Sequence, residues 1–322
     1  MHKKRHHYVP KCYLKFFCDE RGQVVVYLKD TPKKLIHRSP NNTGFHKYYY
    51  SQPLLEGGND HNALENLFSS FEEKWPPIVK RLLLQADVND VIEDIFPFIA
   101  LQRARVPASR DTSEAMLAEM VKSNLRSLDA SGDLPPKPGG FEDILDHVEI
   151  SIDPHQSIHS MVDVIREVEE VLNQIGVGAL HNVTEIPFLT SDNPVIWFDP
   201  SIDEAAMQPY HLQFGGPVVM LFPVTPNLMI YGHSSMRERF KYDGFGYSEL
   251  SDRGAVEMMN RQICRFAYKA VYAQKIGQEA IINEHAHVSP ILQKKTMPSE
   301  AGETTLYNYA FGKPPSKPKW KG

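Results

Sequence analysis

The chain has 322 residues, of which 42% are hydrophobic and 23% are charged, and this ordinary globular composition excludes a wholly disordered protein. The sequence contains no run of about 18 uncharged apolar residues and no apolar segment directly after its basic start. We therefore expect no membrane span, no signal peptide and a cytoplasmic protein. The net charge of −5 gives no global sign of nucleic-acid binding.

The first predicted region, residues 1–58, is a small β region. The run of β-branched residues in "RGQVVVYLKD" is typical of a strand that leaves a turn, and "LIHRSP" and "FHKYYY" predict further short extended segments. Two adjacent histidines precede these strands, in "HHYVPKCYLKFF". We expect His6 to be exposed in a flexible start, and His7 to be fixed against the fold by the apolar run that follows Pro10.

The remaining chain predicts helices and then strands. Residues 59–176 have helical periodicity, interrupted by the Gly- and Pro-rich loop "ASGDLPPKPGGFED", and residues 177–311 predict a mostly antiparallel sheet with one helix near residues 251–263. A small β region, a central helical bundle and a C-terminal sheet form an α+β order without βαβ alternation. We expect residues 1–311 to form a single domain and residues 312–322 to form a flexible basic tail.

The first long helix places polar side chains beside its apolar face. At 100° per residue, His61, Glu65 and Glu72 fall between about 0° and 40°, at the margin of the core stripe. With His7, the two glutamates would suit a divalent metal ion, because imidazole and carboxylate groups are common metal ligands. The alternative is that the glutamates are solvated or pair with an arginine.

The next helix, "VNDVIEDIFPFIALQRARVPASR", places two polar residues inside its apolar arc. Gln102 and Arg103 fall at about 20° and 120°, among the apolar side chains. A buried guanidinium needs a carboxylate, so Arg103 predicts an ion pair with Glu65 or Glu72. Such a pair would orient a substrate or a catalytic group, or it would only hold two helices together.

The same helical geometry yields two further expectations. Arg105 and Arg110 fall further round the helix, where we expect them to meet solvent. Pro76 and Pro77 predict a break or kink just after Trp75, because proline removes a backbone donor and clashes with the preceding turn.

The segment "PFLTSDNPVIWF" places four side-chain hydrogen-bonding groups between two predicted strands. Residues of this kind commonly bond their own backbone in tight turns. The functional alternative is that the strand-end turn presents Ser191, Asp192 and Asn193 at the rim of the sheet. In that case Asp192 is a catalytic candidate, whereas Ser191 and Asn193 would bind substrate. No Gly-rich loop opens a helix as nucleotide-binding motifs require.

The two ends of the chain are basic. No acidic residue precedes Asp19, and the final "GKPPSKPKWKG" holds four lysines. These ends would carry any contact with nucleic acid, and the alternative is that they are only solvated extended segments. The three cysteines, Cys12, Cys18 and Cys264, contain no Cys-x-x-Cys pair, which favours a reducing compartment and argues against a zinc site.

These motifs together resemble, in order and over most of the chain, a bacterial family known as domain of unknown function 4238. The resemblance rests on His-Tyr-x-Pro at residues 7–10 with Tyr-Leu-x-x-Phe at residues 13–17, on the helix with Glu65 and Glu72, on "QRARVP" at residues 102–107, and on Ser-Asp-Asn-Pro at residues 191–194. Cys12 stands where the family pattern leads us to expect an aromatic residue. The resemblance implies no activity.

Two functions remain open from the sequence. The first is a hydrolase of phosphodiester or similar bonds, with a nuclease as one form of it, in which His7, Glu72, Arg103 and Asp192 are catalytic. Gln102, Ser191 and Asn193 would then bind substrate, and a divalent metal would be held by His7, Glu65 and Glu72. The second is a binding or regulatory module in which the same polar residues are structural ties.

Overall fold

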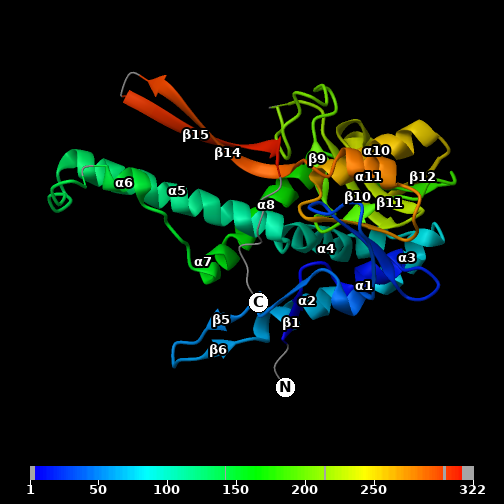
Figure 1. Ribbon diagram of the computed structural model, residues 1–322. Helices are drawn as coiled ribbons and strands as arrows, with labels where there is room; N and C mark the ends of the chain where they lie inside the picture. The colour runs from blue at the N-terminus through cyan, green and yellow to red at the C-terminus, as the bar shows by residue number, and fades with distance from the viewer. Residues whose placement is uncertain (1–3, 142, 214, 300–301, 314–322) are drawn as a thin grey trace.

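The computed structural model describes residues 4–141, 143–213, 215–299 and 302–313 (Figure 1). Figure 1 shows a body of sheets and helices, from which one long helix and a two-stranded hairpin reach outward. The expected α+β class is confirmed: small sheets come first, helices occupy residues 63–172, and a mixed sheet with further helices follows.

The N-terminal region consists of short strands around one short helix. Its elements are β1 (Arg5–His7), α1 (Lys11–Leu14), β2 (Val24–Leu28), β3 (Leu35–Arg38), β4 (Phe45–Lys47), β5 (Gln52–Pro53) and β6 (Asn59–Asp60). The first four residues of β2 are buried, which explains why its sequence is a continuous apolar run without alternation. Strands β1 and β4 form one antiparallel pair, and β5 and β6 form another.

One four-stranded sheet is built from both ends of the chain. Its order is β3-β2-β13-β8, where β8 is Thr190–Ser191 and β13 is Ala270–Ala273. All its pairs are antiparallel, and the register sets Val271 opposite Tyr27 in β2 and opposite Ser191 in β8. The predicted N-terminal β region therefore shares a sheet with strands more than 150 residues further along the chain.

The second large sheet is formed by the C-terminal half alone. Its order is β12-β7-β11-β10-β9, with β7 at Gly176–Asn182, β9 at Ile196–Phe198, β10 at Val219–Thr225, β11 at Leu228–His233 and β12 at Gly246–Leu250. Only the β12 and β7 pair among these is parallel, which agrees with the mostly antiparallel sheet expected from the sequence. The outward hairpin is the antiparallel pair β14 (Ser289–Ser299) and β15 (Gly302–Gly312).

The remaining α-helices of the described chain lie between residues 63 and 284. They are α2 (Ala63–Glu72), α3 (Trp75–Leu83), α4 (Ile92–Ala104), α5 (Pro107–Ser131), α6 (Ile144–His147), α7 (Pro154–His159), α8 (Met161–Leu172), α9 (Arg237–Asp243), α10 (Arg253–Phe266) and α11 (Glu279–Glu284). A break is found, but it lies at residues 73–74, before Trp75 and not just after it as predicted. The prolines at 76 and 77 lie in the first turn of α3, where proline is tolerated because the backbone N–H groups there have no partner within the helix. Helix α5 ends at Ser131 and is followed by Gly132, whose φ of 78° is the left-handed conformation that favours glycine.

Stacked aromatic rings join the helices to the second sheet. The rings of Trp75 and Phe98 are parallel with centroids 4.0 Å apart, and Tyr13 stacks on Phe222 at 5.4 Å. Trp75 also contacts Phe222, with the centroids 5.7 Å apart. Offset stacking of buried rings adds about 0.5 to 1.5 kcal/mol per pair beyond the burial of their apolar area. Helices α1, α3 and α4 are thereby fixed to β10.

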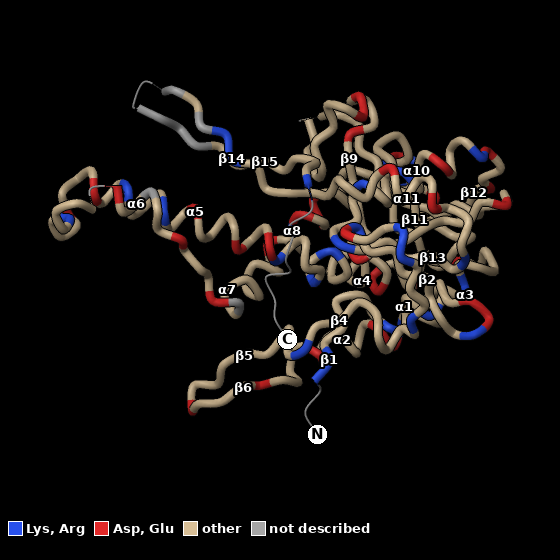
Figure 2. The backbone as a smooth tube through the Cα atoms, in the orientation of Figure 1, with Lys and Arg blue, Asp and Glu red and all other residues tan. Residues whose placement is uncertain are grey.

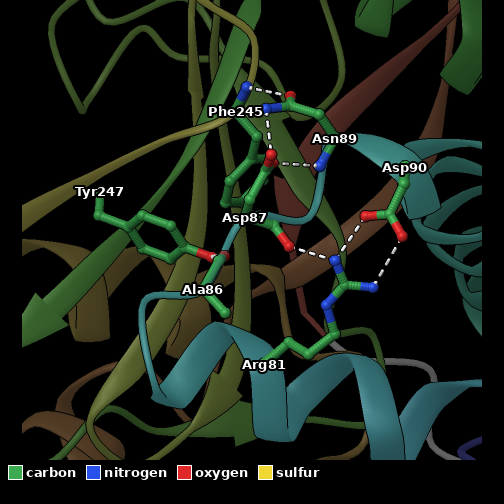
Figure 3. Close-up of polar contacts among 7 residues, drawn as sticks. All are labelled: Arg81, Ala86, Asp87, Asn89, Asp90, Phe245 and Tyr247. Carbon is green, nitrogen blue, oxygen red and sulfur yellow. Dashed lines mark hydrogen bonds and ion pairs between the residues drawn. The ribbon is translucent and has the colours of Figure 1, made fainter.

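The loop between α3 and α4 is tied to β12 by polar contacts (Figure 3). Arg81 Nη1 donates to Asp90 Oδ2 at 3.0 Å, and the Asn89 side-chain oxygen accepts the backbone N–H of Phe245 at 2.8 Å. The Tyr247 hydroxyl donates to the Ala86 carbonyl. A Cβ atom at Gly244 would lie only 2.2 Å from the Asn89 side-chain oxygen, so this close approach requires glycine.

Three expectations about exposure are wrong. Arg105 and Arg110 are 2% and 1% exposed, because α4 ends at Ala104 and both residues lie beyond the helix on which their positions were projected. His6 is fully buried. Its Nδ1 atom accepts the backbone N–H of Tyr50 at 2.8 Å, and its ring stacks on the Tyr50 ring.

Charge and hydropathy add two observations. Figure 2 shows basic and acidic residues interspersed along the tube. Within the described residues, no helix is both long and apolar enough to cross a membrane. Most of the predicted basic tail, from residue 314 onward, lies outside the described residues, so nucleic-acid binding by the tail stays a prediction.

We expect Tyr13→Phe to lower the free energy of unfolding by about 1 to 3 kcal/mol, because it leaves buried polar oxygens without a partner. The Tyr13 hydroxyl donates to the Pro223 carbonyl at 2.6 Å and lies 2.6 Å from the Thr190 hydroxyl. Urea denaturation followed by tryptophan fluorescence measures the change. The control is Tyr242→Phe, at a side chain that is 78% exposed. An equally small effect of both substitutions would contradict the assigned role.

Candidate functional site

A cavity of about 990 Å³ is lined by N-terminal segments, the start of α5, Asp192 and segments after residue 267. Its volume is at the upper end of the range typical of small-molecule sites, about 300 to 1,000 Å³. Most of its wall is apolar, with contributions from Leu28, Pro107 and Val288. The charged residues of its wall are Lys29, Asp30, Asp111, Asp192, Lys269 and Lys313, and the histidines are His46 and His287.

The carboxylate of Asp192 brings the segments of this wall together. Its Oδ1 atom accepts the backbone N–H of Tyr268 at 2.8 Å, and its Oδ2 atom accepts those of Lys269 at 2.7 Å and Ala270 at 3.2 Å. These three donors lie just before and at the start of β13. Asp192 directly follows β8, which pairs with β13. The Asp192 side chain therefore extends the contact between β8 and β13 beyond the last residue of β8.

Lys29 enters the cavity from the end of β2. Its backbone N–H donates to the Lys269 carbonyl at 2.9 Å, which extends the pairing of β2 with β13. The side chain is only 6% exposed. Its Nζ atom donates to the Val288 carbonyl, and the Ser289 hydroxyl lies 3.4 Å away. The amine is thus held between strand β2 and the segment that leads into β14.

Burial shifts the pKa of both charged groups toward the neutral form. Desolvation lowers the pKa of Lys29 to about 7, although the nearby Cys264 and Asp192 oppose this shift. Desolvation also raises the pKa of Asp192, against the stabilising effect of its backbone donors and of the Lys29 charge. Near neutral pH, part of the Lys29 population is therefore a free amine.

Other groups in the wall are also held neutral. Burial, with the charge of Arg110, lowers the pKa of His46 to about 4, so that its imidazole is uncharged at neutral pH. The Tyr268 hydroxyl donates to Asp111 Oδ2 at 2.5 Å, and burial raises the pKa of this phenol. The cavity thus combines apolar walls with an amine, an imidazole and carboxylates, which is a composition suited to acid–base chemistry.

The other polar residues of the Ser-Asp-Asn motif do not line the cavity. The Ser191 hydroxyl accepts the backbone N–H of Asn193 at 3.1 Å. The Asn193 amide donates to the Tyr210 hydroxyl at 2.5 Å and to the Phe266 carbonyl at 2.8 Å. Both residues are fully buried, and their contacts tie the turn to its surroundings.

Gln102 likewise lies inside the fold, as its place in the apolar arc predicted. It is 1% exposed, and its side-chain amide donates to the Tyr8 carbonyl at 3.1 Å. Gln102 is not part of the cavity wall, although Tyr8 is. The substrate-binding roles proposed for Gln102, Ser191 and Asn193 therefore stay predictions, and the contacts of these residues are those of structural ties.

The predicted ion pair of Arg103 with Glu65 or Glu72 is wrong. Arg103 lies over the Tyr210 ring, 4.0 Å from its centroid, and Nη1 donates to the Ser109 hydroxyl. The acidic side chain whose charge acts on Arg103 is Glu167 of α8, the helix that packs against α4. The helical projection gave the burial of Arg103 correctly, but a single-helix projection does not say which neighbouring helix faces it.

Glu72 pairs instead with Arg105, whose Nη1 atom lies 2.9 Å from Glu72 Oε1. His7 is close to this pair, since the charge of Arg105 acts on its imidazole. The structure thus groups His7 with Glu72 and Arg105, whereas Asp192 belongs to the cavity and Arg103 to a third environment.

The proposed metal set of His7, Glu65 and Glu72 is not found as a cluster. Within the described ranges, no group of three or more His, Cys, Asp or Glu side chains is arranged to hold a metal ion. Glu65 lies in the first turn of α2 and is half-buried. A divalent metal therefore has no built site among these three residues.

Sequence reasoning missed Lys29, Lys269, Asp111 and Tyr268. A usable signal existed for Lys29, because a charged residue directly after a mostly buried strand lies at the end of that strand, where sites commonly form. Asp111 sits in the buried first turns of α5. Nothing in the local sequence indicates that it meets Tyr268, more than 150 residues away.

Comparison with protein families gives one match. A family model described as "Protein of unknown function (DUF4238)" matches residues 5–276. Comparisons with curated proteins and with solved structures found no match. The matched range includes β1 through β13, and so it covers both the His7 group and Asp192.

The free energy of unfolding of the wild type should rise between about pH 7 and pH 10, and we expect Lys29→Met to remove this rise. Because the pKa of Lys29 is about 7 in the folded protein and about 10.4 in an unfolded chain, the unfolded state binds more protons between these values. The free energy of unfolding of the wild type should then increase from pH 7 to pH 10 relative to that of the variant. Urea denaturation at several pH values measures the difference.

The matched control is Lys34→Met, at an exposed lysine on the same connection between β2 and β3. We expect it to keep the wild-type dependence on pH. A wild type and a Lys29→Met variant with parallel profiles would show that Lys29 titrates as an ordinary lysine.

Proposed function

The chain belongs to the DUF4238 family, and we propose that it is a hydrolase whose substrate is a small organic molecule bound in the 990 Å³ cavity beside Lys29. The observation that carries the proposal is a buried lysine of lowered pKa in the wall of a large, mostly apolar cavity. Buried groups whose pKa values are shifted toward neutrality are characteristic of catalytic sites.

The proposed reaction uses the free amine of Lys29 as a general base. The amine takes a proton from a water molecule while the water oxygen forms a bond to the electrophilic carbon or phosphorus of the substrate. The bond to the leaving oxygen then breaks, and the Lys29 ammonium returns its proton to that oxygen. The reaction consumes one water molecule and leaves Lys29 unchanged.

Asp192 is a positioning residue in this scheme. Both of its oxygens already accept backbone N–H groups, so its contribution is to fix the wall and to oppose further lowering of the Lys29 pKa. Lys269 would attract an anionic group on the substrate, such as a phosphodiester, and the apolar wall would hold the rest of the molecule.

A non-enzymatic binding module is the second candidate, and a specific observation favours it. The polar ends of Lys29 and Asp192 both have protein partners, namely the Val288 carbonyl and the backbone of residues 268–270. A ligand would then be held mainly by the apolar walls, and no bond would be broken. This candidate corresponds to the binding or regulatory module that the sequence left open, in which the polar residues are structural ties.

We expect the purified protein to hydrolyse p-nitrophenyl esters or bis(p-nitrophenyl) phosphate, with a rate that rises through a midpoint near pH 7. Lys29→Met should lower this rate by about a hundredfold or more, because it removes the general base. Release of p-nitrophenol measured across pH 5 to 9 provides the test.

Lys34→Met serves as the control and should keep both the rate and the pH profile. If the wild type cleaves none of the probes, the hydrolase is rejected and the binding module remains. The binding module predicts that apolar small molecules raise the melting temperature of the protein without being hydrolysed. A Lys29→Met variant with unchanged hydrolysis would remove Lys29 from the mechanism.

A further inference from the structure

A second group of polar side chains, separate from the cavity wall, surrounds Arg105. The guanidinium is buried, and only its Nη1 atom has a polar side-chain partner, the Glu72 carboxylate at 2.9 Å. The Nε and Nη2 atoms are buried and have no hydrogen-bond partner within the described chain. These two atoms form the side-on edge of the guanidinium, which can donate to two oxygens of one oxyanion.

His7 presents a complementary unpartnered atom. Its Nε2 atom is buried and has no hydrogen-bond partner within the described chain, whereas backbone carbonyls of Pro40 and Asn41 accept from the ring. The donating atom must therefore be Nδ1, and the neutral ring keeps a lone pair on Nε2. Burial lowers the pKa of His7 to about 4, which keeps the ring neutral.

The charges around this group favour an anion. Lys11 and Arg105 both act on the His7 ring with positive charge, and Glu72 contributes one negative charge. The local sum of these three groups is +1. Lys11 is exposed, and Cys12 and Glu72 are half-buried, so the group borders the surface.

An unpaired buried donor is costly, about 1 to 3 kcal/mol for each group and more for a charged one. Arg105 carries two such donors on one edge, and the His7 ring, on which the Arg105 charge acts, adds an unpartnered acceptor. A carboxylate or a sulfate would satisfy the donors but has no proton to offer to His7. A hydrogen phosphate satisfies all of them, because it has several acceptor oxygens and one hydroxyl.

We propose that Arg105, His7 and the rim residue Lys11 form a binding site for a hydroxyl-bearing oxyanion of the phosphate class. Two phosphate oxygens accept from Arg105 Nε and Nη2, the phosphate hydroxyl donates to His7 Nε2, and Glu72 keeps the guanidinium oriented through Nη1. Free phosphate and the terminal group of a phosphate monoester share this chemistry. The proposal is independent of hydrolysis in the cavity, since His7, Glu72 and Arg105 are not in its wall.

The test is calorimetric titration of the full-length protein at pH 7 with inorganic phosphate, phenyl phosphate, sulfate and acetate at constant ionic strength. We expect saturable binding of phosphate and an affinity for sulfate about tenfold or more weaker, because a site built to accept a hydroxyl proton discriminates against an anion without one. Binding of phenyl phosphate together with phosphate would identify a monoester site, and binding of phosphate alone would identify a site for the free anion.

Arg105→Lys keeps the charge but removes the side-on edge, and we expect it to weaken phosphate binding about tenfold or more. The matched control is Arg81→Lys, because the guanidinium of Arg81 already forms an ion pair with Asp90 at the surface. This variant should bind phosphate with the affinity of the wild type. His7→Phe, next to the Phe45 ring, should make the affinities for phosphate and sulfate equal. Circular dichroism verifies that each variant is folded.

Several outcomes would overturn the site. If the wild-type protein shows no saturable binding of phosphate, the proposal is contradicted. This outcome does not depend on whether the variants fold. Equal affinities for phosphate and sulfate in the wild type would remove His7 from the site. Unchanged affinity in a folded Arg105→Lys variant would remove the guanidinium edge.

Discussion

The three backbone N–H groups bound by the Asp192 carboxylate are the interaction on which the rest of the molecule depends. They position the start of β13, and β13 joins the N-terminal strand β2 to β8. A charge-assisted bond of this kind contributes about 1.5 to 3 kcal/mol, and three of them converge on one buried group. Without them, the segment that carries Tyr268 and Lys269 would have no fixed place beside Lys29.

The same arrangement gives the cavity its chemistry. Burial that lets Asp192 organise the backbone also removes water from Lys29, and so one structural requirement produces both the scaffold and the lowered pKa of the amine. The charge of Asp192 limits how far the Lys29 pKa falls. An amine that titrates near neutral pH is the result, in a wall that is otherwise mostly apolar.

Local patterns in the sequence predicted what is local in the structure. The α+β order, a helix break close to Pro76 and the burial of Gln102 and Arg103 follow from periodicity and proline chemistry. The partner of Glu72 did not follow, because α4 ends at Ala104, directly before Arg105, whereas the projection continued the helix through Arg105. The cavity was not predicted as a whole, since it joins β2 to segments more than 150 residues away. Of the predicted catalytic, substrate-binding and metal-binding residues, Asp192 alone lies in its wall, and it was identified through its strand-end turn.

The central claim is that Lys29 is a buried amine that loses its proton near neutral pH. Its rate of acetylation by trace acetic anhydride, measured against pH by mass spectrometry and compared with that of the exposed Lys34, tests this most directly. The account predicts that the Lys29 rate rises through a midpoint near pH 7 and then levels off. Two lysines whose rates rise in parallel would contradict the account.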